Sequence, residues 1–181
     1  MDLTLILGPM KSGKSYDLIS FFAPLHYTDI PFALYQPARN VRDEQIHSRN
    51  GIGINAQKIV RLQEIIPTSA RIIGIDELHM FDSNEVPYIE QLLHGGIKII
   101  ASGLDLDYQG KMFATTQRLL ELGPKEVRYR RAVCEICKSP EATHSQVLQS
   151  NLPLTQGMPP TIPDDGTFGY QARCRKCFVK N

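Results

Sequence analysis

The strongest constraint on the fold lies in residues 8–15, which read Gly-Pro-Met-Lys-Ser-Gly-Lys-Ser and fit the pattern G-x-x-x-x-G-K-[ST]. An apolar run, Leu3 to Leu7, comes directly before them, and helical spacing over Lys14 to Phe22 follows. Glycines in such a loop let backbone N–H groups close around a phosphate at the positive end of the helix. We therefore predict a phosphate-binding loop, with Lys14 at the β- and γ-phosphates of a nucleoside triphosphate and the Ser15 hydroxyl on Mg²⁺. The residues expected around the phosphates are Gly8, Pro9, Met10, Lys11, Ser12, Gly13, Lys14 and Ser15.

Apolar runs and helical stretches alternate along the first 130 residues. The apolar runs are Leu3 to Leu7, Phe32 to Tyr35, Ile72 to Ile75 and Ile97 to Ala101. The stretches with helical spacing are Lys14 to Phe22, Val86 to Leu93 and Gln117 to Leu122. Continuously apolar strands that alternate with helices are typical of a parallel sheet covered on both faces. Residues 1–130 are therefore predicted to form a three-layer α/β domain of the P-loop NTPase type, with a mainly parallel sheet.

Composition narrows the class of partner. The 181 residues carry a formal net charge of +1, which provides no basic field for nucleic acid. The first residues lack the basic region and cleavage site of a signal peptide, and no apolar run is long enough to cross a membrane. We expect a cytoplasmic protein with a small-molecule ligand, without nucleic-acid or membrane partners.

Two adjacent carboxylates, Asp76 and Glu77, follow the third apolar run directly. Open α/β sheets bind ligands at the carboxyl ends of their strands. Asp76 occupies the position of the acid that holds Mg²⁺ beside a phosphate loop, directly or through water. Glu77 would orient a water molecule in an ATPase or take the proton of an acceptor hydroxyl in a kinase, and the pair alone does not choose between these roles.

The four cysteines form two C-x-x-C pairs, Cys134 with Cys137 and Cys174 with Cys177. Four thiolates suit a closed tetrahedral Zn²⁺ site, which is structural because it leaves no open position. Redox pairs and unrelated free thiols are the alternatives. Prolines and glycines crowd residues 152–169, so we expect no regular secondary structure there. Residues 131–181 are thus predicted to form a small zinc-ribbon module that holds an irregular loop, the lasso, at both ends.

Three more segments can be set beside the phosphate loop: Ile75-Asp-Glu-Leu-His-Met-Phe81, Gly103-Leu-Asp-Leu-Asp-Tyr-Gln-Gly-Lys-Met-Phe113 and Tyr170-Gln-Ala-Arg-Cys-Arg-Lys-Cys177. Together these four motifs resemble, in order and spacing, the zinc-containing (type II) thymidine kinase family over nearly the whole chain. The resemblance implies transfer of the γ-phosphoryl group of ATP to the 5′-hydroxyl of a deoxynucleoside, with thymidine to dTMP as the expected reaction in the salvage of DNA precursors. It also implies a homotetramer.

The resemblance assigns roles position by position. It makes Glu77 the general base, and Arg42 matches an arginine near the phosphates. The lasso is implied to close over the nucleoside and to contact the base with backbone groups. Ordinary core packing is the alternative for Met10, Leu104 and Phe113. The positions that line the base and sugar pocket in the family are Met10, Met80, Leu104, Tyr108, Phe113 and Tyr170.

The chain also departs from the family pattern. Met80 replaces an aromatic residue, Val147 an arginine and Asn40 an aspartate, while Pro163 removes a backbone donor from the lasso. We assign no catalytic role to His79, because such a residue is more often hydrogen-bonded and structural. These departures keep open a P-loop ATPase or nucleotide-sensing protein, and a zinc-ribbon binding module with a vestigial nucleotide site.

Overall fold

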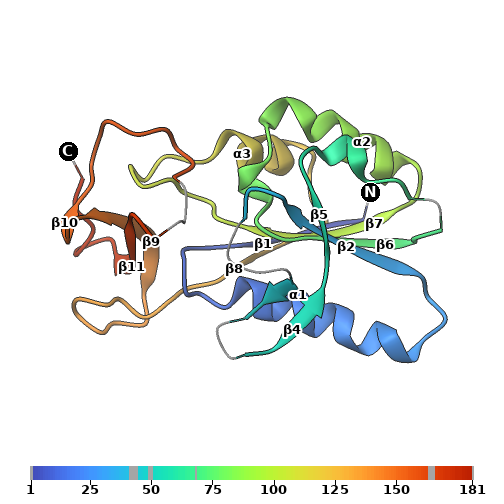
Figure 1. The fold of residues 1–181 in the computed structure, drawn as a ribbon, viewed down its shortest axis with the longest axis horizontal. Helices are drawn as coiled ribbons and strands as arrows, with labels where there is room; N and C mark the ends of the chain where they lie inside the picture. Colours follow the sequence, from blue (N-terminus) through green and yellow to red (C-terminus); the bar gives the residue numbers. More distant parts are fainter. Residues whose placement is uncertain (1, 41–44, 49–50, 68, 163–165, 181) are drawn as a thin grey trace.

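The structure is a computed structural model that describes residues 2–40, 45–48, 51–67, 69–162 and 166–180. The strands of its main sheet are β1 (Leu3–Leu7), β2 (Phe32–Pro37), β5 (Gln57–Ile59), β6 (Ile72–Ile75), β7 (Lys98–Gly103) and β8 (Glu126–Tyr129). All six pair in parallel, in the order β5-β2-β6-β7-β1-β8 (Figure 1). The carboxyl ends of β1, β6 and β7 therefore meet at one edge of the sheet.

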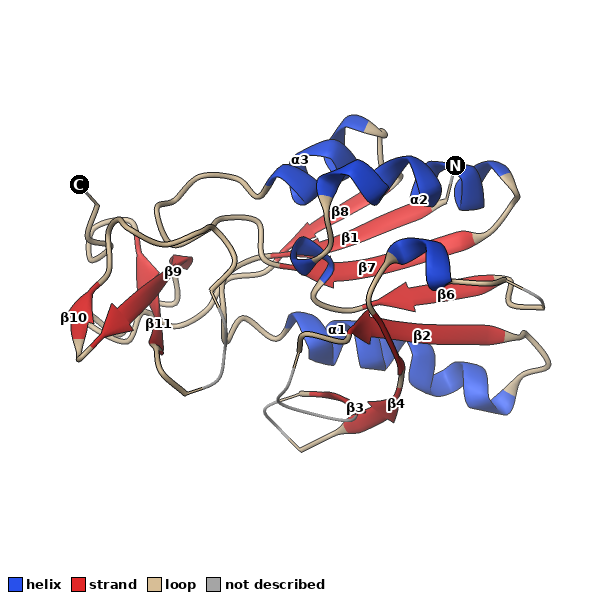
Figure 2. Cartoon of the chain, turned by 45° about the horizontal axis from the view of Figure 1, so that its top comes forward, coloured by secondary structure: helices blue, strands red, loops and turns tan. Residues whose placement is uncertain are grey.

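Helices cover both faces of this sheet. Helix α1 (Lys14–Phe22) lies on one face, and α2 (Val86–His94) and α3 (Ala114–Glu121) lie on the other (Figures 1 and 2). Alternation along β1 produces the two layers, because Leu5 is buried among residues of α2 and α3 whereas Ile6 is buried with those of α1. Short 3₁₀ helices complete this part: Ala23–Tyr27, Leu62–Glu64, Leu78–Met80 and Ser83–Glu85. The predicted three-layer α/β fold is confirmed.

The predicted elements differ from the observed ones mainly at their ends. The sequence predicts β1, β6 and α1 with the observed bounds, while β2 and β7 each continue two residues further than expected. Helix α3 begins at Ala114 instead of Gln117, because the buried Thr115 and Thr116 donate hydrogen bonds to the carbonyls of Phe81 and Leu104. Apolar spacing does not show such polar anchors.

A second, smaller sheet follows the main one. It consists of β9 (Ala142–Gln149), β10 (Leu152–Pro153) and β11 (Gly169–Cys174), antiparallel in the order β10-β9-β11 (Figure 2). A hairpin of β3 (Gln45–His47) and β4 (Gly53–Asn55) pairs with neither of these sheets, and its buried isoleucines pack with residues of α1. Residues 152–169 were expected to have no regular secondary structure, which is wrong at both ends: Leu152–Pro153 form β10 and Gly169 begins β11. Pro153 is tolerated because β10 is an edge strand. Between β10 and β11, the described residues form no helix or strand, as expected. Throughout the described ranges, no helix combines the length and the apolar character needed to cross a membrane.

Candidate functional site

The phosphate loop leaves the carboxyl end of β1 and leads into α1, as the sequence predicts. Gly8 has a φ of 147°, and a side chain there would collide with the backbone carbonyl of Arg130. Gly13 precedes α1 in the left-handed conformation, with a φ of 84°. Both positions therefore require glycine. Lys14 is buried, and its ammonium donates a hydrogen bond to the carbonyl of Pro9 at 2.7 Å, which holds the cation inside the loop.

A carboxylate lies beside the start of α1. The Ser15 hydroxyl donates to one oxygen of Asp76 at 2.9 Å, and the Ser102 hydroxyl donates to the other. Burial, with the adjacent charge of Glu77, raises the pKa of Asp76 to about 6. A carboxylate and a hydroxyl are oxygen ligands of the kind that Mg²⁺ takes beside phosphates, so this pair fits a metal ion. Ser102 is not among the residues predicted from the sequence; its signal there is a hydroxyl directly after the apolar residues of β7.

Glu77 follows Asp76 in an unusual backbone conformation. Its φ of 49° is left-handed, which side chains other than glycine seldom adopt. Strain of this kind gathers at functional sites, where the surrounding structure maintains it. The side chain of Glu77 is 28% exposed and lines a cavity. The conformation therefore keeps a carboxylate at an accessible surface directly beside the buried Asp76.

His79 is buried behind Glu77. Its Nδ1 accepts the backbone N–H of Leu104 at 3.1 Å, and its ring lies 4.7 Å from that of Phe113, centroid to centroid. Burial, with the charges of Lys14 and Arg39, lowers the pKa of His79 to about 3. The imidazole is therefore neutral, and its 3.4 Å approach to Glu77 is not an ion pair. This agrees with the expected structural role.

A cavity of about 490 Å³ joins the phosphate loop to an apolar wall. Its size falls in the range of small-molecule sites. Two buried hydroxyls on it, of Ser12 and Ser48, have no hydrogen-bond partner within the described ranges, and such groups call for a ligand or water. Ser48, His47, Thr161 and Ile162 were not expected here. All the residues expected in the nucleoside pocket line the cavity, together with Glu77: Met10, Met80, Leu104, Tyr108, Phe113 and Tyr170.

Three departures from the family pattern can be placed, at least in part. Val147 is 3% exposed and shares a buried cluster with Tyr108 and Ile162 on the cavity wall. Asn40 donates to the side-chain oxygen of Gln36 at 3.4 Å. Met80 lines the cavity, as expected of a side chain that faces the base. Arg42 and Pro163 lie outside the described residues.

The lasso is fastened by side chains of two segments. The Tyr108 hydroxyl donates to the carbonyl of Met158 at 2.7 Å and accepts the N–H of the same residue at 3.2 Å. Gln109 donates to the carbonyl of Thr155 at 3.2 Å. At the far end, the Tyr170 hydroxyl donates to the carbonyl of Ile162 at 3.2 Å. Residues just after β7 thus hold the lasso over the cavity.

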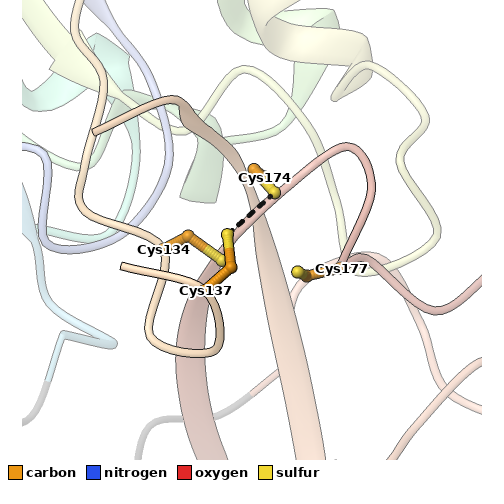
Figure 3. Close-up of side chains that lie close together, drawn as sticks. All are labelled: Cys134, Cys137, Cys174 and Cys177. Carbon is orange, nitrogen blue, oxygen red and sulfur yellow. Dashed lines mark hydrogen bonds between the residues drawn. The ribbon is translucent and has the colours of Figure 1, made fainter. Parts of the chain in front are cut away.

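The four cysteines come together at the base of the second sheet, as predicted (Figure 3). All four sulfur atoms lie within 4.8 Å of one another, and those of Cys137 and Cys174 are 3.6 Å apart. Tetrahedral Zn²⁺ with bonds of about 2.3 Å places thiolates about 3.8 Å apart, whereas a disulfide needs about 2.05 Å. Burial, with the neighbouring thiols, raises the pKa of Cys177, whereas hydrogen bonds from backbone N–H groups lower the pKa of Cys174, so the four thiols share their negative charge unequally and a bound cation would favour the thiolate form of all four. The cluster fits a closed zinc site.

Comparisons with known proteins agree with these observations. The family model described as thymidine kinase matches residues 1–178. A thymidine kinase of Mycoplasma mobile is 32% identical over 183 residues, covering 98% of this chain and 87% of the relative. A thymidine kinase of Thermococcus kodakarensis is 34% identical over 184 residues, covering 96% and 92%. One from Mesomycoplasma hyopneumoniae is 34% identical over 181 residues, covering 97% and 94%.

Proposed function

The chain belongs to the thymidine kinase family and is a nucleoside kinase, and we propose that it transfers the γ-phosphoryl group of ATP, with Mg²⁺, to the 5′-hydroxyl of thymidine. The observation that carries the proposal is the cavity that joins the phosphate loop, Glu77 and an aromatic wall. Glu77 lines this cavity directly after Asp76, so we propose that it lies where the bound triphosphate and the nucleoside meet. The expected product is dTMP.

We propose that the donor end binds the phosphates. Backbone N–H groups of the loop and the ammonium of Lys14 offset the phosphate charge, and the α1 N-terminus adds its dipole. Asp76 and Ser15 would hold Mg²⁺, which when bound neutralises charge on the β- and γ-phosphates. The hydrogen bond between these two side chains already sets them at 2.9 Å, so little reorganisation is needed. Arg42 remains a proposed phosphate contact from the sequence.

At the acceptor end, Glu77 is proposed to take the proton of the 5′-hydroxyl as that oxygen attacks the γ-phosphorus. Phosphoryl transfer depends mainly on positioning and electrostatics, and a correctly placed base contributes about 10²- to 10⁴-fold. The neutral His79 sits 3.4 Å from Glu77 and adds no positive charge beside it. The proposed contacts of base and sugar are Met10, Met80, Leu104, Tyr108, Phe113 and Tyr170.

The cysteine cluster is proposed to hold a structural Zn²⁺ that fixes the lasso. Cys134 and Cys137 precede β9, and Cys174 ends β11, so the cluster closes the second sheet on the side opposite the lasso. We propose, accordingly, that residues 1–130 form the nucleotide-binding part and residues 131–181 the lasso module. The homotetramer is proposed from the family resemblance, and light scattering tests it.

The test of the function uses the purified protein with ATP, Mg²⁺ and a panel of nucleosides. Thymidine should yield dTMP, and Glu77→Gln should lower kcat by about 10²- to 10⁴-fold, because the amide cannot accept the proton. Binding of ATP should persist in this variant, since its loop is untouched. ATP hydrolysis without phosphorylation of any nucleoside would refute the kinase proposal and favour the ATPase.

A further inference from the structure

We infer that Lys11, in the phosphate loop, positions the lasso by pairing with Glu135. Glu135 lies in the turn between Cys134 and Cys137, which we call the first knuckle. The inference deepens the proposed function and rests on it. Lys11 has a left-handed φ of 66°, which turns its side chain away from the course of α1. Its ammonium lies 2.6 Å from Glu135 Oε1 and donates to the carbonyl of Tyr170 at 3.1 Å. The ammonium of Lys11, in the phosphate loop, thus contacts both the first knuckle and the residue at the end of the lasso.

The contact between Lys11 and Glu135 also reaches β11, because Glu135 is hydrogen-bonded to that strand. The same Oε1 accepts the N–H of Ala172 at 2.9 Å, and the backbone N–H of Glu135 donates to the carbonyl of Ala172 at 2.9 Å. Glu135 lies between Cys134 and Cys137, so any ion that orders the knuckle also orders this carboxylate. A continuous series of contacts therefore runs from the cysteine cluster through Glu135 to Lys11 and Tyr170.

A second contact joins the same two parts. The backbone N–H of Met10 donates to the hydroxyl of Ser145, on β9, at 2.9 Å. Neighbouring residues of the phosphate loop thus bond to β9 and to β11, the two strands that flank the lasso. Because Tyr170 lines the cavity and its hydroxyl bonds to Ile162, a shift of β11 moves the acceptor wall directly. The Lys11 to Glu135 pair is expected to affect the nucleoside more than ATP.

The strength of the pair follows from its exposure. The side chains of Lys11 and Glu135 are 28% and 32% exposed, so solvent screens them in part. A charged donor with a charged acceptor is nevertheless stronger than a neutral pair, and this carboxylate is held by a second donor. We expect a moderate effect, roughly threefold to tenfold in the KM for thymidine, that weakens at high salt.

The experiment is a double-mutant cycle on the full-length, zinc-loaded protein. Glu135→Gln keeps one oxygen that can accept the N–H of Ala172, removes the negative charge and replaces the second carboxylate oxygen with an NH2 group. It should raise the KM for thymidine threefold to tenfold, while the KM for ATP and kcat change less than twofold. Lys11→Met should raise the KM for thymidine similarly, and the double variant should be no worse than either single variant. Lys11→Arg should restore most of the lost affinity.

A matched control is the exposed ion pair of Arg128 with Glu126 on β8, 2.8 Å apart and away from the cavity. Arg128→Met should leave both KM values unchanged. Additive effects in the cycle, or a Lys11→Met effect on the KM for ATP alone, overturn the inference. If even the wild type phosphorylates no nucleoside, the proposed function fails separately. Hydrogen exchange of the Tyr170 and Ala172 amides then decides: faster exchange in Lys11→Met, which removes the cation that holds Glu135 and the Tyr170 carbonyl, supports the link, and unchanged exchange refutes it.

Discussion

Removing one hydroxyl group, with Tyr108→Phe, should loosen the lasso without changing the phosphate loop. The Tyr108 side chain is 3% exposed, and its hydroxyl serves both the carbonyl and the N–H of Met158. Phenylalanine keeps the ring and its packing against Val147 and Ile162 in the same buried cluster. The change therefore isolates two hydrogen bonds.

The size of the effect follows from the exposure of Met158. A buried polar group left without a partner costs about 1–3 kcal/mol. Met158 is only half-buried, and water can reach part of its backbone once the lasso shifts, so we expect about 1–2 kcal/mol in total. Since about 1.4 kcal/mol is a factor of ten, the equilibrium constant for docking of the lasso falls by about 5- to 25-fold. If thymidine binds only the docked state, its KM rises by up to that factor.

The assay is the KM for thymidine at saturating ATP, with limited proteolysis within residues 152–169 as a direct measure of docking. The matched control is Tyr88→Phe, whose hydroxyl donates to the carbonyl of the buried Ile65 at 2.6 Å, away from the cavity. This variant should lower the melting temperature by about 2–4 °C per kcal/mol and leave the KM unchanged. A Tyr108→Phe variant with wild-type KM and wild-type proteolysis would refute the reasoning.

Two further predictions concern charge and metal. Burial raises the pKa of Asp76 to about 6, so the Asp76 carboxyl binds a proton more tightly in the folded state than in the unfolded chain. The free energy of unfolding of the protein without Mg²⁺ should therefore rise as the pH falls from 7 to 5. Asp76→Asn should remove this pH dependence from thermal melts, and the Mg²⁺-dependent rate of the wild type should fall as the pH falls from 7 to 5. Identical pH profiles of stability for the wild type and Asp76→Asn would contradict the prediction. Cys137→Ser, at an exposed thiol, should lower the zinc content measured by mass spectrometry and raise the KM for thymidine while equilibrium ATP binding persists. Full activity without zinc would count against a structural metal.

The main sheet was predictable because its strands are buried on both faces. Runs such as Leu3–Leu7 and Ile72–Ile75 are continuously apolar, and short runs of this kind between helical stretches are typical of the strands of a covered parallel sheet. The second sheet was not predictable in this way. Strand β9 buries His144, Ser145 and Gln146, whose polar groups are satisfied only in the folded chain, as when Gln146 accepts the N–H of Val179. Periodicity treats such residues as exposed, so the ladder of β9 with β11 stayed hidden.

The same distinction separates the two ends of the cavity. The donor end is nearly contiguous in sequence, from β1 through the loop to α1, and a local pattern therefore predicts it. The acceptor end combines side chains from separate segments, which only the family resemblance could bring together before the fold was seen. Val147 shows what the structure adds. An arginine at this position, packed with Tyr108 and Ile162, would bury its charge among apolar groups at considerable cost. The valine instead packs in the same cluster as Tyr108 and adds an apolar side chain to the wall of the cavity, so the apolar character of this position fits the surroundings that the fold gives it.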